Sequence, residues 1–159
     1  MGRVASDDYF IRIALKEAEK ACQKEEVPVG AVLVINSKVV GRAHNIRESK
    51  FDPTGHAETI VLRRAAMRLK RWRLNDATLY VTKEPCIMCA GVMINARLGR
   101  LVYGCSDSKG GAQTLFRILS DRRLNHTISL TAGVCEDECA GMLRRFFSER
   151  RKKAKEGIE

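Results

Sequence analysis

DATLYVTKEPCIMCAGVMINARLGRLVYG, residues 76–104, decides the fold, because it predicts a strand, a helix and a second strand in succession. DATLYVT, residues 76–82, is an apolar run rich in β-formers and predicts a buried strand. Pro85 predicts a helix start, since its missing amide donor costs little in a first turn. RLVYG, residues 100–104, predicts the next strand.

The preceding segments predict a helix, a hairpin and a second helix. Ser6 with two acidic residues indicates a helix start, and apolar residues recur at helical spacing to about Lys24. VPVGAVLVI, residues 27–35, and KVVGRAHN, residues 38–45, predict antiparallel strands joined by a turn. DPTG, residues 52–55, precedes a helix whose inner face is expected to carry Ala57, Ile60, Val61, Ala65 and Leu69.

The rest of the chain completes an α/β pattern. AQTLFRIL, residues 112–119, predicts a short helix, and HTISL, residues 126–130, predicts a weak fifth strand. A final amphipathic helix is expected from Asp137 to about Lys153, with Met142, Leu143, Phe146 and Phe147 inward. Strands that alternate with helices predict a central mixed sheet covered on both faces, and 159 residues suit one domain over 1–159.

Charge and hydropathy restrict the partners. The chain carries a net charge of +10, with six basic residues in RRAAMRLKRWR, residues 63–73, and a second basic run in RRFFSERRKKAKE, residues 144–156. One such run is typical of a solvated helix face, but two favour a polyanion such as nucleic acid. The longest apolar runs are too short to span a bilayer, and MGRVASDDYF lacks a signal-peptide core, so we expect a cytoplasmic protein without membrane association.

Two short motifs predict a metal site. Cys86 and Cys89 lie three residues apart on one helix face, and a helix start favours their thiolates. With His56 they supply three zinc ligands, and a fourth position open to water is typical of catalytic zinc. Either motif, His-x-Glu or Cys-x-x-Cys, can arise alone by chance. Because each is expected at the start of its own helix, the two together indicate a metal site. Cys135 and Cys139 are either core thiols or the source of a fourth ligand that closes the site, whereas Cys22 and Cys105 are expected in the core.

Glu58 distinguishes a catalytic site from a structural one. It follows His56 by two residues, so its side chain points elsewhere and can sit beside a metal-bound water without coordinating the metal. A carboxylate there can accept and deliver a proton. The alternative is a first-turn acid that only complements the helix dipole.

These motifs are similar to those of a known family. HAE and PCIMC resemble the zinc-dependent cytidine and deoxycytidylate deaminase superfamily, and VPVGAVLV, DPTGHAE, LNH and ECAGMLRRFFSERR resemble its bacterial tRNA-specific adenosine deaminases, from about Asp7 to Arg151. The resemblance implies a three-layer α/β/α cytidine-deaminase-like fold with a five-stranded mixed sheet. It also implies one Zn²⁺ per subunit on His56, Cys86 and Cys89, with Glu58 as the proton carrier in the hydrolytic conversion of adenosine to inosine.

The same resemblance implies a substrate and an assembly. The family acts on the first anticodon base of an arginine tRNA and forms homodimers. Asn45 matches a residue that binds the base or ribose, and Val29 and Ala57 match pocket walls, Ala57 through its backbone. The matches to residues beside the RNA are Asp107, Lys109, Phe147, Arg150 and Arg151. Gly55, Cys105 and the loop NIRESKF, residues 45–51, depart from the family pattern and bear on recognition of the RNA loop.

Two other functions compete with this one. A deaminase of a free base or nucleoside such as guanine or cytidine needs no surface for a polyanion, so the charge of +10 argues against it. A non-catalytic RNA-binding module with structural zinc requires a fourth protein ligand and gives Glu58 no role.

Overall fold

The strand–helix–strand unit that the sequence predicts forms the centre of the molecule in the computed structural model, which describes residues 5–157. Strand β3, Ala77–Lys83, is followed by helix α4, Ile87–Asn95, and strand β4, Arg100–Cys105. The two strands are parallel, with Tyr80 opposite Val102. Their carboxyl ends therefore lie at one edge of the sheet, the edge at which sites collect in open α/β sheets.

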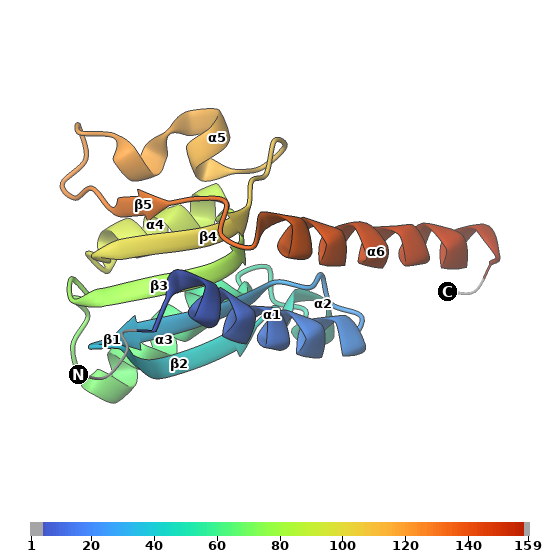
Figure 1. The fold of residues 1–159 in the computed structure, drawn as a ribbon, viewed down its shortest axis with the longest axis horizontal. Helices are drawn as coiled ribbons and strands as arrows, with labels where there is room; N and C mark the ends of the chain where they lie inside the picture. The colour runs from blue at the N-terminus through green and yellow to red at the C-terminus, as the bar shows by residue number, and fades with distance from the viewer. Residues whose placement is uncertain (1–4, 158–159) are drawn as a thin grey trace.

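Three further strands complete a mixed sheet in the order β2-β1-β3-β4-β5 (Figure 1). Strands β1, Gly30–Ile35, and β2, Lys38–His44, form the predicted hairpin, with Asn36 and Ser37 both at positive φ in the turn. Strand β1 is antiparallel to β3, so the start of β1 and the end of β2 reach the same edge as the carboxyl ends of β3 and β4.

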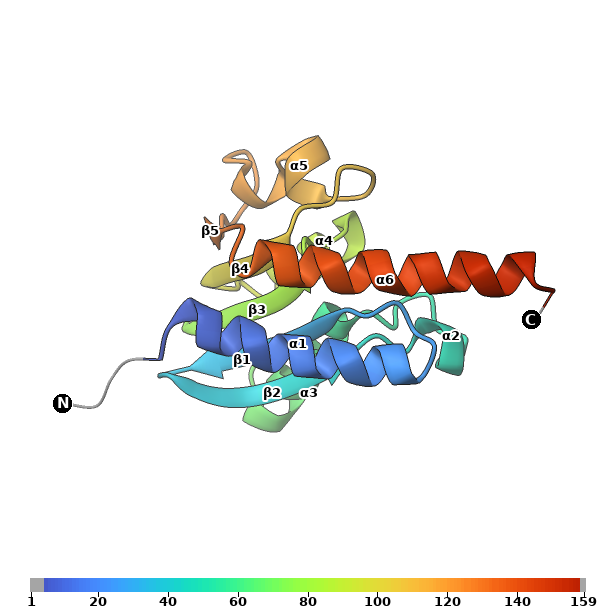
Figure 2. The ribbon, with the colours of Figure 1, turned by 45° about the vertical axis from the view of Figure 1, so that its right-hand side comes forward.

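The helices cover both faces of this sheet, as the sequence predicts. Alternate residues of the strands point to opposite faces. Leu33, Leu79 and Leu101 join an apolar cluster with residues of helix α3, Ala57–Leu69, and of α4. Val32, Tyr80 and Val102 join a second cluster with helix α1, Asp7–Gln23, and with Cys139 of helix α6, Glu136–Lys155. Figures 1 and 2 show α1 and α6 side by side on this second face.

Helix α1 lies against β1 because Gly30 lacks a side chain. A Cβ on Gly30 would be 2.0 Å from the Ala14 carbonyl oxygen and 2.5 Å from the Ala18 backbone nitrogen. The helix begins as predicted, with the Ser6 hydroxyl accepting a hydrogen bond from the Tyr9 N–H at 3.4 Å.

Several elements differ from the sequence prediction. The helix expected over 112–119 is interrupted, because Arg117 has a φ of 50° between α5, Ala112–Phe116, and a 3₁₀ helix, Ile118–Ser120. The fifth strand is only Ser129–Thr131, since the Ile128 N–H instead bonds the Leu119 carbonyl at 3.2 Å. A short helix α2, Arg47–Lys50, was not predicted.

Two side chains expected in the core lie elsewhere. Phe147 is 40% exposed, because it lies on the edge of the α6 apolar face, whereas Phe146 is buried as predicted. Cys22 is half-buried and lines a groove of about 540 Å³ between α1 and α6. Cys105 is buried as expected.

Within residues 5–157, none of the helices is long and apolar enough to cross a bilayer. The first four residues, part of the stretch in which the sequence shows no signal-peptide core, lie outside the described residues.

Candidate active site

Three candidate metal ligands converge where α3 and α4 begin. His56 is the N-cap residue of α3 and Cys86 is the N-cap residue of α4, with Cys89 in the first turn of α4. His56 Nδ1 lies 3.5 Å from Cys86 Sγ and 3.5 Å from Cys89 Sγ. Among the described residues, His56, Cys86 and Cys89 are the one group with donor atoms within 4.8 Å of one another that could hold a metal ion.

The chemistry of these donors fits zinc. Two thiolates and one imidazole are ligands that Zn²⁺ accepts in tetrahedral geometry. A hydrogen bond from Cys89 favours the thiolate of Cys86 and lowers the pKa of Cys86 to about 4. The same contact, together with burial, raises the pKa of Cys89. The Cys86 thiolate in turn raises the pKa of His56 through their hydrogen bond.

Cys135 and Cys139, the possible sources of a fourth metal ligand, do not reach this site. Cys139 is buried against β4, where a Cβ on Gly104 would be 2.4 Å from Cys139 Sγ. Cys135 is the N-cap residue of α6 and packs in the same cluster on the α1 face. Of the two alternatives that the sequence left open, the structure therefore favours packing on the α1 face, with Cys139 a core thiol, over a fourth ligand.

Glu58 lies beside the ligand group in the first turn of α3. Its side chain is only 4% exposed, and burial raises the pKa of its carboxyl group. Glu58 lines the same cavity as His56 and Cys86, so it faces the space in which a substrate would meet the metal. A buried carboxyl group with a raised pKa suits the transfer of protons at neutral pH.

Asn45 is held by the start of α3. Its Oδ1 accepts a hydrogen bond from the Ala57 N–H at 2.9 Å, in a helix whose N-cap side chain makes no capping bond. This contact satisfies a backbone donor that the helix itself cannot satisfy. It also fixes the orientation of the Asn45 side-chain amide. Oδ1 accepts from Ala57, so Nδ2 remains as the donor available to the cavity.

The cavity beside these residues has a volume of about 250 Å³. It is lined by six of the predicted substrate-binding and catalytic residues together with two metal ligands: Val29, Asn45, Glu58, Asp107, Phe147 and Arg150, with His56 and Cys86. The Arg150 guanidinium lies over the Phe146 ring, 5.8 Å from its centroid. Ala57 is buried and contributes through its backbone N–H, as predicted.

Two predicted RNA-binding residues lie outside the cavity wall. Lys109 is exposed on the loop after β4, where its N–H donates to Asp107 Oδ1 at 3.0 Å. Arg151 is exposed on α6, one residue after Arg150. Both residues are exposed, Lys109 two residues after the cavity residue Asp107 and Arg151 directly after Arg150.

Four residues of the cavity wall were not singled out by the sequence: Val27, Arg47, Lys83 and Glu84. Lys83 forms an ion pair with Asp107 at 2.9 Å, and Glu84 is 2% exposed. The available signal was their position in the sequence, since Lys83 directly follows the predicted strand, residues 76–82, and Glu84 directly precedes the Pro85–Cys86 pair. Their contacts join segments more than twenty residues apart, which no local pattern reveals.

Comparisons with known proteins agree with this geometry. A sequence model of the MafB19-like deaminase family matches residues 5–151. A protein of Bacillus subtilis named tRNA-specific adenosine deaminase is 48% identical over 153 residues, which cover 96% of this chain and 95% of that protein. A protein of Haemophilus influenzae with the same name is 44% identical and covers 94% of this chain and 87% of that protein.

Solved structures are similar as well. One comes from studies of A-to-I editing by tRNA:A34 deaminases at the wobble position, with a TM-score of 0.81 and 42% identity over 84% of this chain and 98% of that chain. A guanine deaminase from Nitrosomonas europaea has a TM-score of 0.74 and covers 91% of this chain and 86% of that chain. Its identity is 20%, so it is similar in fold alone.

Proposed function

The chain belongs to the MafB19-like deaminase family, and we propose that it is a tRNA adenosine deaminase that converts adenosine to inosine at the first anticodon position. One observation carries this proposal: a buried carboxyl group, Glu58, lies beside a His–Cys–Cys group and faces a cavity of about 250 Å³. We propose that the chain acts as one deaminase domain over 1–159.

The metal that we propose is Zn²⁺, held by His56, Cys86 and Cys89, one ion per chain. When bound, Zn²⁺ supplies a Lewis acid that makes a water nucleophilic at neutral pH. The chain fixes the three donors on two helix starts, where the strands β3 and β2 end. Thr59 Oγ1 lies 3.4 Å from Cys89 Sγ and links the two helices beneath the site.

Glu58 is the proposed proton carrier. It accepts a proton from the attacking water and delivers that proton to N1 of adenine while the water oxygen bonds to C6. It then takes the remaining proton from the new C6 hydroxyl group and gives it to the departing amine, so that the C6–N bond breaks, ammonia leaves and the oxygen remains as the C6 carbonyl of inosine. Its burial excludes bulk water that would otherwise exchange these protons.

Asn45 is the proposed base-positioning residue. Its Nδ2 points toward the cavity as a donor, because the Ala57 N–H occupies Oδ1. A donor there can bind an acceptor of the purine or its ribose. Val29 provides an apolar wall against the base.

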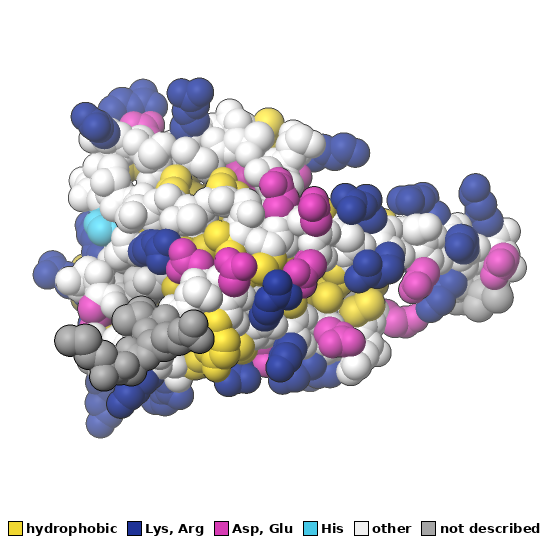
Figure 3. Space-filling view, viewed as in Figure 1, with side chains coloured by type: hydrophobic (Ala, Val, Ile, Leu, Met, Phe, Trp, Pro, Cys, Tyr) yellow, Lys and Arg dark blue, Asp and Glu magenta, His cyan; other side chains and the backbone are white. Residues whose placement is uncertain are grey.

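An RNA substrate accounts for the surface around the cavity. Arg150 and Lys83 line its wall, and Lys109 and Arg151 are exposed nearby. Figure 3 shows Lys and Arg side chains along α6, interspersed with acidic ones. Bases of an anticodon loop can be turned out of their stack into a pocket, and their phosphates pair with such cations. Phe147, 40% exposed at the cavity, can stack on a neighbouring base.

The assembly and the setting are further parts of the proposal. We propose a homodimer that acts in the cytoplasm, with an arginine tRNA as the substrate. Exposed apolar side chains on α3, α4 and α5 support a dimer: Met67, Ile87, Leu115 and Phe116 are 46% to 68% exposed. All three helices lie on the face opposite α1 and α6. Sedimentation equilibrium of the zinc-loaded protein tests the dimer.

The function is tested by incubation of the zinc-loaded protein with a mixed tRNA pool. Inosine is then quantified by mass spectrometry of the digested RNA and located by sequencing, in which inosine reads as guanosine. We expect inosine at the first anticodon position of tRNA(Arg) and an equal release of ammonia. Parallel incubations with guanine, cytidine and free adenosine test the alternative of a small-molecule substrate, and ammonia from those alone would contradict the proposal.

A further inference from the structure

The Glu84 carboxylate is the most heavily hydrogen-bonded buried acid at the cavity within the described residues, and the deaminase mechanism gives it no role. It lines the cavity wall but is only 2% exposed. Oε2 accepts from the Asp107 N–H at 2.7 Å and from the Thr114 hydroxyl at 2.7 Å. Oε1 accepts from the Gln113 N–H at 3.0 Å and the Thr114 N–H at 2.6 Å.

The donors of all four hydrogen bonds lie in one segment, the loop between β4 and α5 together with the first turn of α5. Gly111 allows this approach, because a Cβ there would be 2.4 Å from Glu84 Cδ and 2.5 Å from its Oε1. A buried carboxylate is costly unless its oxygens are paired, so the loop must close on Glu84. Glu84 is therefore a buried anchor of the loop, beside the Lys83–Asp107 ion pair and the hydrogen bond from the Ala112 N–H to the Pro85 carbonyl.

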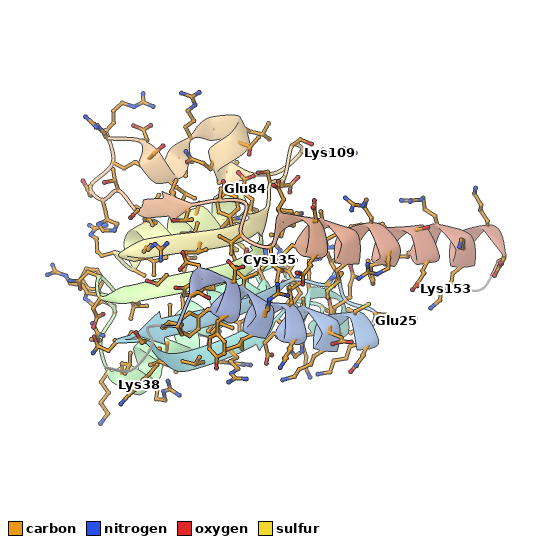
Figure 4. The ribbon with its side chains drawn as sticks, in the orientation of Figure 1. Glu25, Lys38, Glu84, Lys109, Cys135 and Lys153 are labelled. Atoms are coloured by element: carbon orange, nitrogen blue, oxygen red, sulfur yellow. The ribbon has the colours of Figure 1, made fainter. Side chains whose placement is uncertain are left out.

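The loop carries the residues proposed to contact RNA. Asp107 lines the cavity and pairs with Lys83 at 2.9 Å, and its Oδ1 accepts from the N–H of Lys109. Figure 4 shows Lys109 at the outer end of the loop, with Glu84 nearer the sheet. Glu84 also precedes the metal ligand Cys86 by two residues, so it ties the outer loop directly to the segment that holds the metal.

We propose that Glu84 is a positioning residue that holds the Asp107–Lys109 loop in the geometry that binds RNA at a fixed distance from the reacting base. This inference rests on the proposed function, since it assigns the loop to tRNA binding. A displacement of about 1 Å in such a contact lowers catalytic efficiency by up to about a hundredfold. Glu84→Gln is therefore expected to reduce kcat/KM for tRNA by about tenfold or more, mostly through KM.

The decisive test is a double-mutant cycle between Glu84 and Lys109. The four proteins are compared in a Glu58→Gln background, so that a fluorescent anticodon stem-loop is bound without turnover. Lys109→Ala is expected to weaken binding severalfold when Glu84 is present and hardly at all when Glu84 is replaced by Gln. Such coupling is a property of residues that act through one another, and a general loss of stability does not produce it.

Two controls separate positioning from folding and from metal binding. The zinc content of Glu84→Gln is expected to equal that of the parent. Asp7, at the start of α1, accepts hydrogen bonds from Tyr80 and from Arg100, which lies at the end of β4 away from the loop. Asp7→Asn is expected to lower stability without changing RNA affinity. Glu84→Asp keeps a carboxylate and is expected to restore part of the coupling with Lys109.

If Glu84→Gln does not fold, Gly111→Ala replaces it in the cycle, because the added Cβ pushes the loop off the carboxylate. Its matched control is Gly141→Ala in α6, whose Cβ would meet only the flexible ends of Arg145, at 3.3 Å, and Arg144, at 3.8 Å. Additive effects in the cycle, no effect of Lys109→Ala in the parent, or loss of zinc from the Glu84 variant would each overturn the inference. Failure of the wild type to form inosine would instead overturn the proposed function.

Discussion

Asn45 Oδ1 accepts a hydrogen bond from the Ala57 N–H at 2.9 Å, so the residue that we propose positions the base also completes the helix on which Glu58 lies. A side chain from the end of β2 thus performs the task that an N-cap residue normally performs. The distance between Asn45 and Glu58 is set by this bond. In the proposed mechanism, the residue that binds the base and the residue that transfers the proton are therefore positioned by the same helix start.

Replacement of Asn45 tests both roles separately. Asn45→Ala leaves the Ala57 N–H without a partner in a buried site, which is expected to cost about 1–3 kcal/mol of unfolding free energy. Asn45→Asp keeps the acceptor for Ala57 and replaces the donor to the base, so it is expected to retain stability and lose activity. Urea unfolding and single-turnover assays on tRNA measure the two effects. Equal stability of both variants would contradict the capping role.

The elements that the sequence predicted well depend on local patterns. The hairpin turn at Asn36 and Ser37 adopts positive φ at both residues, and the first helix begins at its predicted cap. The misplaced elements depend on contacts outside the segment or on backbone conformations that the local pattern does not encode. Ile128 leaves the expected strand because its N–H bonds Leu119, and Arg117 interrupts a helix with a left-handed turn that its residue type does not announce.

The residues of the site also divide into those that a local motif predicts and those whose partners lie far away in the sequence. His56, Cys86 and Cys89 stand at helix starts with the spacing of zinc ligands, so short sequence motifs were sufficient to predict that they meet. Glu84 and Lys83 could not be assigned, because their partners Asp107 and Thr114 follow more than twenty residues later. Arg47 lies in α2, a four-residue helix whose backbone is held by the buried Glu26 rather than by its own sequence.

Glu58→Gln tests the proton carrier. Gln has almost the same shape as Glu, and a neutral amide is less costly to bury, so unfolding free energy and zinc content are expected to remain or to rise slightly. The rate of the chemical step is expected to fall by about a hundredfold to ten-thousandfold, the usual contribution of general acid–base catalysis. Single-turnover conversion of tRNA measures the rate, and affinity for the stem-loop is the control. Wild-type turnover in this variant would remove Glu58 from the mechanism.

Acid stability is expected to depend on Asp7. Hydrogen bonds from Arg100 hold the pKa of Asp7 below its ordinary value of 3.8, so the ionised form stabilises the folded state. For a lowered pKa, this contribution is complete above the unfolded pKa and is lost as pH falls through the folded pKa. The difference in unfolding free energy between wild type and Asp7→Asn should be constant from pH 7 to about pH 5 and shrink below about pH 4.

Urea unfolding at several pH values measures this difference. Asp8→Asn is the matched control, because Asp8 is exposed in the same helical turn and makes no side-chain hydrogen bond within the described residues. Its effect is expected to be small at every pH. A difference for Asp7→Asn that stays the same down to pH 2 would mean that the Arg100 pair does not control acid stability.

Salt dependence identifies the cations that bind RNA. Affinity for the stem-loop should fall as salt rises, with a slope of about 0.7 per phosphate contacted in single-stranded RNA. Arg150 lines the cavity, so Arg150→Ala is expected to reduce the magnitude of that slope by about 0.7. Lys38→Ala is the control, because Lys38 lies in the hairpin at the far end of the molecule from Lys109 (Figure 4). An equal change in slope for both variants would indicate nonspecific attraction by the overall charge rather than a contact at the cavity.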